Sequence, residues 1–531
     1  MNRGRPHPEG HQREGPDLSR FFTASALALA LLSARATSAS ADDIDRRVDA
    51  LFDASTGWYV DLVFSPFPGT NFPWIVAWLV IAATVFTVYF GFIQFRAVRH
   101  SLDLVRGKYD DPTAPGEVSH FQALATALSG TVGLGNIAGV AVAVGIGGPG
   151  ATFWMIVAGL LGMAAKFTEC TLGVKYRNEY EDGTVSGGPM YYLTKGFRER
   201  GLPGGRLFAV LFSVFCILGA LGGGNMFQAN QAHAQISSIT GDYPGWVTGT
   251  VFAAILLAVI LGGLTSIARV TGRIVPFMGM VYVLAALIVF VTNADKIPWA
   301  IGQVLDGAFT GLGVAGGFAG ALIQGFKRAA FSNEAGVGSA AIAHSAVRTR
   351  EPVTEGYVAL LEPFIDSVVV CTLTAFVIII SGQLLIDPDT GLYLLNEGGT
   401  EIMTVAGNSG IELTSAAFSS TYSWFRYVLG LAVVLFAFST MITWSYYGLK
   451  AWTFLFGESE VKAKAFKIAF CLFAIIGASS DLDRVIDFSD AAVFSMAVIN
   501  VIGLYLLMPI VKAELVSYQA RRASGEIRAT H

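Results

Sequence analysis

The sequence contains several apolar runs of about 20 residues that are free of Lys, Arg, Asp and Glu. A helix of that length crosses the hydrocarbon core of a bilayer, where every backbone group has to be bonded within the protein. Only 14% of the residues are charged, whereas soluble proteins carry about 25%. The sequence therefore predicts an all-α integral membrane protein that lies in the lipid bilayer. With a net charge of −4 and no basic block, nucleic acid is not an expected partner.

Eleven transmembrane helices are expected, and the distribution of Lys and Arg orients them, because these side chains resist translocation. The segments assigned to the cytoplasmic side hold 22 Lys and Arg residues, and those assigned to the outside of the mature chain hold 5. We therefore expect the amino terminus outside and the carboxyl terminus in the cytoplasm, in a cell (inner) membrane. The spans are expected to begin near Pro73, Phe121, Ala151, Leu207, Gly245, Val275, Phe318, Val358, Tyr427, Phe466 and Asp490.

The parts of the chain outside these spans differ in composition. Residues 1–41 combine four arginines, the apolar run FFTASALALALLS and an A-x-A site, which is the pattern of a secretory signal peptide, either cleaved or retained. The four cysteines lie in apolar runs without a CxxC pair, so neither a disulfide nor a cysteine-based metal site is expected. After the signal peptide we expect a periplasmic interfacial segment (42–72), an additional transmembrane helix (73–97), two five-helix repeats (118–293 and 310–512) and a cytoplasmic tail (513–531).

Two of the spans contain glycine clusters that weaken a helix. The stretch SGTVGLGNIAGVAVAVGIGGPG in span 2 holds eight glycines, and GALIQGFKRAAFSNEAGVGSAAIAHS in span 7 adds polar Ser, Asn and Glu near its middle. Each glycine inside a helix costs about 1 kcal/mol relative to alanine. Such clusters serve either close helix packing or helix breaks that line a cavity. Because the clusters are five spans apart, they favour two broken helices in a 5+5 inverted repeat.

The chemistry of two broken helices indicates what they bind. Amino-terminal helix ends carry free N–H groups and partial positive charge, which suit a carboxylate. Unwound carbonyls and hydroxyls suit Na⁺ and an ammonium group. The sequence therefore predicts a secondary active transporter that binds an amino acid with co-transported Na⁺ and needs no organic cofactor. No HExxH or GxSxG motif supports an enzyme. A channel or uniporter for a small polar solute, or a membrane-embedded enzyme, remain the alternatives.

Several blocks of this sequence are similar to the alanine or glycine:cation symporter family. They include FQALATALSGTVGLGNIAGVAVAVGIGGPGATFWM, GGGNMFQANQ, GFKRAAFSNEAGVGSAAIAHS and FAFSTMITWSYYG, within a resemblance that covers roughly residues 70–515. The resemblance implies a LeuT-like fold and sodium-coupled symport of small neutral amino acids, alanine or glycine, into the cytoplasm by alternating access. The segment VGLGN also resembles the unwound segment of the neurotransmitter:sodium symporters.

The resemblance also implies roles for individual residues. Asn136 resembles a side chain that serves both a sodium site and the site geometry, and Trp444 resembles a wall that excludes longer substrates. Gln228 either reaches the substrate or bonds a neighbouring helix. The expected substrate-binding residues are Thr131, Gly133, Gly135, Asn136, Gln228, Phe331, Ser332, Thr440 and Trp444. The expected sodium-binding residues are Ser129, Val132, Asn136, Ser439 and Thr440.

Charged residues inside spans are costly and are expected to have partners. Lys327 and Arg328 in span 7 are opposite in sign to Glu362 and Asp366 in span 8, so we expect at least one structural ion pair between the two groups. Lys166 and Glu169 are expected to reach the interface from the inner end of span 3. His233 and His344 are expected to be surface or packing residues. No obligate protein partner is inferred.

Overall fold

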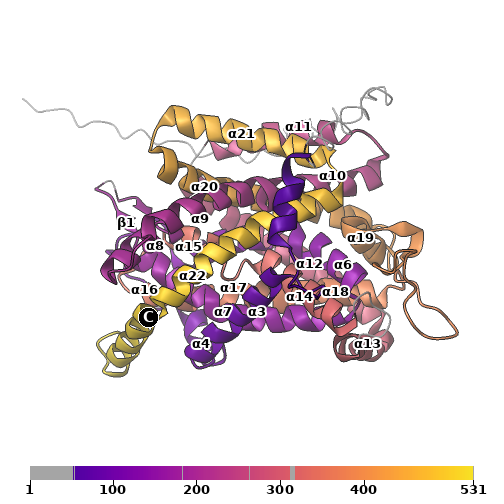
Figure 1. Cartoon of the computed structure of the whole chain (residues 1–531), viewed down its shortest axis with the longest axis horizontal. Helices are drawn as coiled ribbons and strands as arrows, with labels where there is room; N and C mark the ends of the chain where they lie inside the picture. Colours follow the sequence, from indigo (N-terminus) through magenta and orange to yellow (C-terminus); the bar gives the residue numbers. More distant parts are fainter. Residues whose placement is uncertain (1–51, 53, 182, 262–263, 311–316, 530–531) are drawn as a thin grey trace, which may run out of the picture.

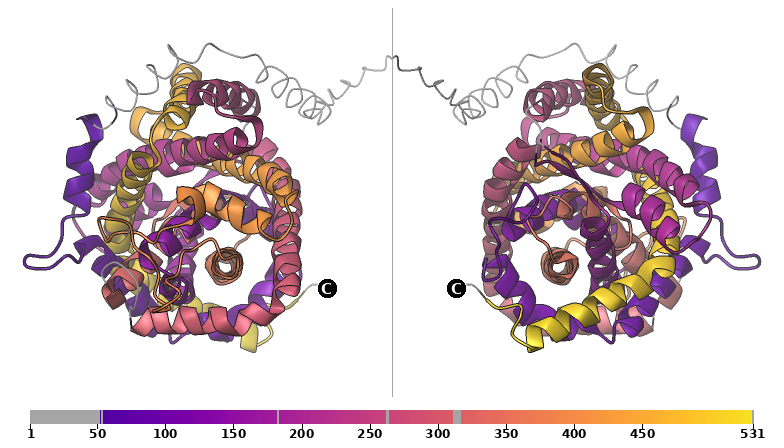
Figure 2. Two further views of the ribbon diagram at one scale, coloured as in Figure 1. Left: turned by 90° about the vertical axis from the view of Figure 1, so that its right-hand side faces the viewer. Right: turned by 90° about the vertical axis from the view of Figure 1, so that its left-hand side faces the viewer.

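The computed structural model describes residues 52, 54–181, 183–261, 264–310 and 317–529. The expected signal peptide and the start of the expected interfacial segment, residues 42–51, lie outside these residues. Residues 54–63 of that segment are helical. Helices account for most of the described chain and lie roughly along one direction (Figure 1), and they form a ring when viewed from either end (Figure 2).

The first half of the described chain alternates long apolar helices with short connections. It contains α3 (Trp74–Tyr89), α4 (Ile93–Val105), α5 (His120–Thr131), η1 (Leu134–Asn136), α6 (Ala138–Gly147), α7 (Gly150–Lys175), α8 (Pro189–Glu199), α9 (Gly205–Leu221), η2 (Gly222–Met226), α10 (Phe227–Thr240), α11 (Gly245–Ile260) and α12 (Leu264–Thr292). A short antiparallel hairpin, β1 (Asn178–Glu179) with β2 (Val185–Ser186), follows α7.

The second half of the described chain is also mostly helical and has further interruptions. It contains η3 (Ala294–Lys296), α13 (Ile297–Phe309), α14 (Gly317–Asn333), α15 (Ser339–His344), α16 (Pro352–Ala359), α17 (Leu361–Pro363), η4 (Phe364–Cys371), α18 (Thr372–Ile380), η5 (Val405–Gly407), α19 (Gly410–Ser419), α20 (Phe425–Phe456), α21 (Glu460–Ser479) and α22 (Leu482–Ala523). The elements η2 and η4 are π-helical, whereas η1, η3 and η5 are 3₁₀ helices.

Apolar length and apolar surface both identify this as a membrane protein. Six helices of the described residues are long and apolar enough to cross a bilayer, or up to eight if each of two bent helix pairs is one span. Large apolar side chains point outward along α12, where Phe277, Met280 and Val291 are 55%, 62% and 78% exposed. Such a surface is stable against lipid but not against water.

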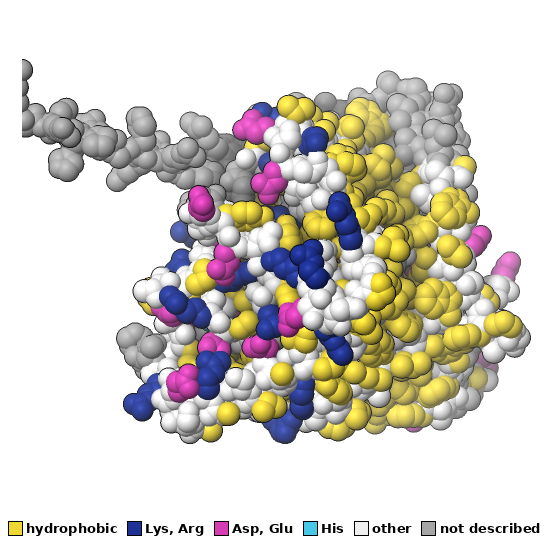
Figure 3. All heavy atoms as spheres, turned by 60° about the vertical axis from the view of Figure 1, so that its left-hand side comes forward, with side chains coloured by type: hydrophobic (Ala, Val, Ile, Leu, Met, Phe, Trp, Pro, Cys, Tyr) yellow, Lys and Arg dark blue, Asp and Glu magenta, His cyan; other side chains and the backbone are white. Residues whose placement is uncertain are grey.

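Charge gathers at one end of the molecule. In Figure 3, Lys and Arg side chains crowd the face that corresponds to the left-hand side of Figure 1, where α4, α8 and the carboxyl-terminal end of α22 lie. Next to them the surface is mostly apolar. We call this the basic end of the molecule.

The expected additional helix 73–97 is not one continuous helix. Helix α3 ends at Tyr89, and α4 leaves it at an angle of 74°. Phe92, immediately before α4, has a left-handed backbone (φ 55°), which breaks the helix there. Helix α4 carries charged residues on one side and buries Ile93, Ala97 and Leu104 on the other.

Two interruptions define the centre of the fold. Helix α5 ends at Thr131, and the segment Leu134–Gly147 continues at an angle of 58° to it. Helix α14 ends at Asn333, and α15 begins only at Ser339. We call residues 132–137 the first break and residues 334–338 the second break. Because a broken helix leaves backbone groups without intrahelical partners, other parts of the protein have to supply them.

Candidate functional site

The first break is stabilised by side chains that bond its free backbone groups. The Gly133 N–H donates to Oδ1 of Asn136 at 2.9 Å, so one of these side chains belongs to the break itself. The Leu134 N–H donates to Oε1 of Gln228 in α10 at 3.1 Å. A Cβ at Gly133 would collide with the Thr440 hydroxyl, so the backbone approaches α20 closely only because residue 133 is glycine. The break is therefore a built feature with partners from two further helices.

The second break depends on left-handed backbone. Gly336 and Gly338 have φ of 81° and 94°, and Glu334 adopts φ 54° although it is not glycine. The Gly336 carbonyl accepts a hydrogen bond from Nδ2 of Asn500 in α22 at 2.9 Å. The Ala335 N–H donates to Oδ1 of Asn333 at 2.9 Å. A side chain next to the break and a side chain from another helix therefore replace missing helical bonds here as well.

A small cavity lies between the two breaks. Seven of the expected substrate-binding residues line it, whereas Gly133 and Asn136 do not. The Phe331 ring forms part of the apolar wall and lies close to η2, since a Cβ at Gly223 would approach this ring to 3.1 Å. The lining residues are Gly130, Thr131, Gly135, Gly223, Gln228, Phe331, Ser332, Glu334, Thr440, Trp444 and Val493.

Four of the expected sodium-binding residues lie where α5 meets α20. Oγ1 of Thr440 donates to the Ser129 carbonyl at 3.1 Å, and Oγ of Ser129 donates to the Ser439 carbonyl at 2.8 Å. Val132 follows α5 as its carboxyl-terminal cap. Hydroxyl and carbonyl oxygens therefore gather at the end of a helix, whose partial negative charge favours a cation. Oxygen is the ligand atom that hard cations such as Na⁺ prefer.

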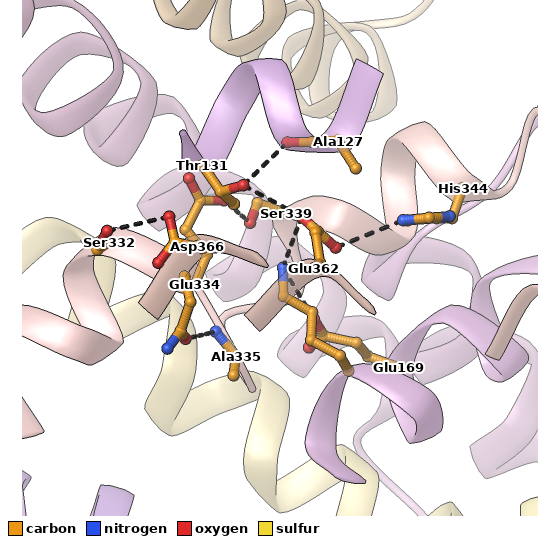
Figure 4. Close-up of polar contacts among 12 residues, drawn as sticks. Ala127, Thr131, Glu169, Ser332, Glu334, Ala335, Ser339, His344, Glu362 and Asp366 are labelled. Carbon is orange, nitrogen blue, oxygen red and sulfur yellow. Dashed lines mark hydrogen bonds and ion pairs between the residues drawn. The ribbon is translucent and has the colours of Figure 1, made fainter. Parts of the chain in front are cut away.

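Asn136 lies apart from this oxygen group and joins the first break to the π-helical segment η4. Its Nδ2 donates to Oδ1 of Asp366 at 2.6 Å, and Oγ of Ser332 donates to the same oxygen at 3.1 Å. Oδ2 of Asp366 accepts a hydrogen bond from Oγ of Ser367 at 2.8 Å. Figure 4 shows Ser332 and Asp366 pointing toward each other from α14 and η4. One buried carboxylate thus ties the first break and the end of α14 to η4.

The expected ion pair between Lys327 or Arg328 and Glu362 or Asp366 is wrong. Lys327 lies 3.1 Å from Oδ2 of Asp490, and Arg328 bonds the same carboxylate. The reason is packing, because α14 lies against α22, which carries Asp490. A buried charged side chain pairs with an opposite charge on the helix that its own helix face contacts.

Glu362 instead forms the centre of a buried polar cluster. Its Oε1 lies 3.3 Å from Nζ of Lys166 and accepts a hydrogen bond from Oγ1 of Thr131 at 3.5 Å. Its Oε2 lies 3.4 Å from Nε2 of His344. Figure 4 shows Glu362 between Thr131, which lines the cavity, and His344. The cluster therefore reaches the edge of the cavity.

The expectation that Lys166 and Glu169 reach the interface is wrong, and of the two alternatives for His344 the structure favours a packing residue. Lys166 and Glu169 are 0% exposed and face α17 and α22 rather than the interface. His344 is buried, and its Nδ1 lies 2.5 Å from Oε1 of Glu355. The second oxygen of Glu355 lies 2.5 Å from Nδ1 of His120, at the start of α5. These groups link α5, α7, α15, α16 and α17, an arrangement that depends on helix packing and has no signal in the local sequence.

Glu334 and Gly223 line the cavity, although neither is among the expected substrate-binding residues. Glu334 belongs to the quoted SNEAG segment and is the only titratable residue among those that line the cavity. Gly223 belongs to the run Gly222–Gly224, which forms the π-helical segment η2. Short π segments within α-helices occur frequently at functional sites. A Cβ at Gly224 would collide with the Trp444 side chain, so this glycine lets the tryptophan approach.

A comparison with protein families identifies the chain. The model of the sodium:alanine symporter family matches residues 60–531. The chain belongs to the sodium:alanine symporter family. As a member, it is a sodium-coupled amino-acid symporter and not an enzyme, as its sequence predicted.

The names of individual relatives agree with the assignment to the sodium:alanine symporter family. The chain is 39% identical over 457 residues to the sodium/alanine symporter AgcS of Methanococcus maripaludis, covering 86% of this chain and 95% of that protein. It is 33% identical over 448 residues to the amino-acid carrier protein AlsT of Bacillus subtilis, covering 83% and 88%. Its fold resembles the crystal structure of MhsT in complex with L-phenylalanine, with a TM-score of 0.52, 14% identity, and coverage of 76% and 99%.

Proposed function

We propose that this symporter carries a small neutral amino acid, alanine or glycine, together with Na⁺ into the cytoplasm by alternating access. The observation that carries the proposal is the small cavity between two helix breaks, with apolar walls at Phe331, Trp444 and Val493. The name of the relative AgcS, a sodium/alanine symporter, supports alanine as a substrate. A larger side chain meets the Trp444 wall, and excluding one methylene this way contributes about 1–3 kcal/mol of selectivity.

We further propose that the helices form eleven spans, with a LeuT-like 5+5 inverted repeat after one additional span. In this assignment α3 is the additional span, α5 with α6 through α12 form the first repeat, and α14 with α15 through α22 form the second. The two breaks then occupy the first span of each repeat, as the repeat requires. The charge pattern supports a cytoplasmic basic end, a cytoplasmic carboxyl terminus and an inner-membrane location.

The amino acid and Na⁺ are assigned to different sides of the first break. The carboxylate of the amino acid bonds the backbone near Thr131 and Gly135, with Gln228, Ser332 and Thr440 around it. One Na⁺ is coordinated by oxygens of Ser129, Val132, Ser439 and Thr440, and Asn136 contributes to a sodium site and to the geometry of the break. The hydrogen bonds between α5 and α20 support this assignment, because they bring hydroxyl and carbonyl oxygens of the two helices together.

Alternating access is proposed as a movement between two groups of helices. Helix α7 packs against α14 and α16, whereas α20 packs against α9 and α11 packs against α21. The cavity lies between these groups, with lining residues from α5, α14, η2 and α20. A rocking movement of one group against the other opens the cavity first to one side and then to the other.

A concentrative uptake assay tests the function. The purified full chain is reconstituted into liposomes, and uptake of labelled alanine is followed with an inward Na⁺ gradient. Accumulation above the external concentration, abolished when K⁺ replaces Na⁺, is the expected result. Equilibration without accumulation indicates a channel or uniporter and contradicts the proposal. Competition by glycine and by leucine then measures how strictly the cavity selects for size.

A further inference from the structure

Glu334 places a carboxylate in a cavity that otherwise contains no charged group among its lining residues. The residue is 3% exposed and follows directly after α14, in the second break. Its left-handed backbone (φ 54°) is uncommon for a residue other than glycine. Strained backbone of this kind costs roughly 1–3 kcal/mol and persists where the surroundings enforce it, often at functional sites. The protein thus holds an acidic side chain here at a cost.

The hydrogen-bond partners of Glu334 are neutral. Nε1 of Trp444 donates to Oε1 at 3.1 Å, and Oγ of Ser339 donates to Oε2. A carboxylate offers about four acceptor positions, so these two bonds leave part of its capacity open. Among the described residues, no Lys, Arg or His lies within the 4.0 Å ion-pair distance of this carboxylate. A buried carboxylate without a cation is unfavourable.

The neighbouring cations are already engaged by other carboxylates. Lys166 lies 3.3 Å from Glu362 and 3.8 Å from Glu169, and His344 bonds Glu355 at 2.5 Å. In the part of the chain that the structure describes, Lys166 therefore acts on Glu334 only from beyond ion-pair distance. A ligand of the cavity can supply the direct positive partner that this side chain lacks.

We propose that the Glu334 carboxylate is the counter-ion of the substrate's ammonium group. This inference rests on the proposed function, and it narrows the substrate class to small molecules with a free ammonium group next to their carboxylate. The carboxylate end of the substrate lies at the first break and the ammonium end at the second, so the zwitterion bridges the two breaks. Trp444 orients the Glu334 carboxylate through its indole N–H and also forms the wall of the cavity.

The proposal predicts strong discrimination against amine-free analogues. Propionate has the size and the carboxylate of alanine but lacks the ammonium group. A site built around a buried charged partner rejects an analogue that leaves this partner unpaired, commonly by a factor of about 10⁴ or more. We expect propionate to compete with labelled alanine at least about 1,000-fold more weakly than unlabelled alanine does.

Equilibrium binding to the purified full chain in saturating Na⁺ tests this assignment. Labelled alanine is displaced by alanine or by propionate, and the ratio of the two affinities is compared between wild type, Glu334→Gln and Glu334→Asp. In Glu334→Gln, alanine binding falls by about 100-fold, and the alanine-over-propionate ratio falls toward one. In Glu334→Asp, which keeps the charge, the preference for alanine persists. Glu412→Gln, which removes a carboxylate from α19 outside the cavity, keeps the wild-type ratio.

The outcomes that overturn the inference are separate from those that overturn the function. A Glu334→Gln variant that binds alanine with the wild-type preference over propionate refutes the role of Glu334. If that variant does not fold, wild type alone decides, because equal competition by propionate and alanine refutes an ammonium-specific site. Absence of sodium-dependent alanine binding in wild type refutes the proposed function instead.

Discussion

Replacing Asn136 by alanine tests how the first break is coupled to sodium. The change removes the 2.6 Å hydrogen bond to Asp366 and the 2.9 Å bond from the Gly133 N–H. A hydrogen bond to a charged group contributes about 1.5–3 kcal/mol, and one between neutral groups about 0.5–1.5 kcal/mol. Together the closed site loses about 3 kcal/mol, which corresponds to roughly a 100-fold change in an equilibrium constant.

Sodium-dependent uptake in liposomes measures this effect. We expect the Na⁺ concentration that half-saturates alanine uptake to rise by roughly 100-fold in Asn136→Ala, at a fixed membrane potential. Asn230→Ala is the matched control, because Asn230 is also buried and donates to the backbone carbonyls of Gly477 and Ser480. Asn230 does not line the cavity. Its loss should lower the unfolding temperature and leave the Na⁺ response unchanged.

The result that refutes this reasoning is specific. If Asn136→Ala folds and retains the wild-type half-saturating Na⁺ concentration, the bond between the first break and η4 does not contribute to the sodium-loaded site. If Asn230→Ala shifts the Na⁺ response equally, the effect reports general loss of packing and not a role of the break.

Three further changes test other parts of the site. Thr440→Ala removes the 3.1 Å bond to the Ser129 carbonyl and should raise the half-saturating Na⁺ concentration by about 5-fold, whereas an unchanged value in the uptake assay contradicts the sodium assignment. Trp444→Ala should let leucine compete with labelled alanine, while Trp444→Phe retains the wall; unchanged competition by leucine in the alanine variant counts against a size filter. Lys166→Met should lower the free energy of unfolding by about 3–5 kcal/mol, because two buried carboxylates lose their cation. The double variant Lys166→Met with Glu362→Gln should unfold in detergent at a higher temperature than Lys166→Met alone. An equal unfolding temperature argues against the ion pair between Lys166 and Glu362.

The role of each intramembrane charge could not be predicted from the sequence. Lys327 and Arg328 pair with Asp490, which lies more than 150 residues away in the chain. A spacing rule finds partners one or two helix turns apart, but it contains no information about which face of α14 meets α22. The same limit hid the burial of Lys166, since its apolar surroundings come from other helices.

The membrane class, the family and the positions of the helix-weakening segments could all be predicted from the sequence. These properties are local, because hydropathy decides where a helix is stable in lipid and glycine decides where its backbone bends. Helix packing, in contrast, determines which side chains share the cavity and which charges neutralise one another. Glu334 became a cavity residue only because the second break lies beside Trp444 of α20, and Glu362 became the partner of Lys166 only because α17 packs on α7. Contacts of this kind depend on how helices far apart in the chain face each other, which no single segment encodes.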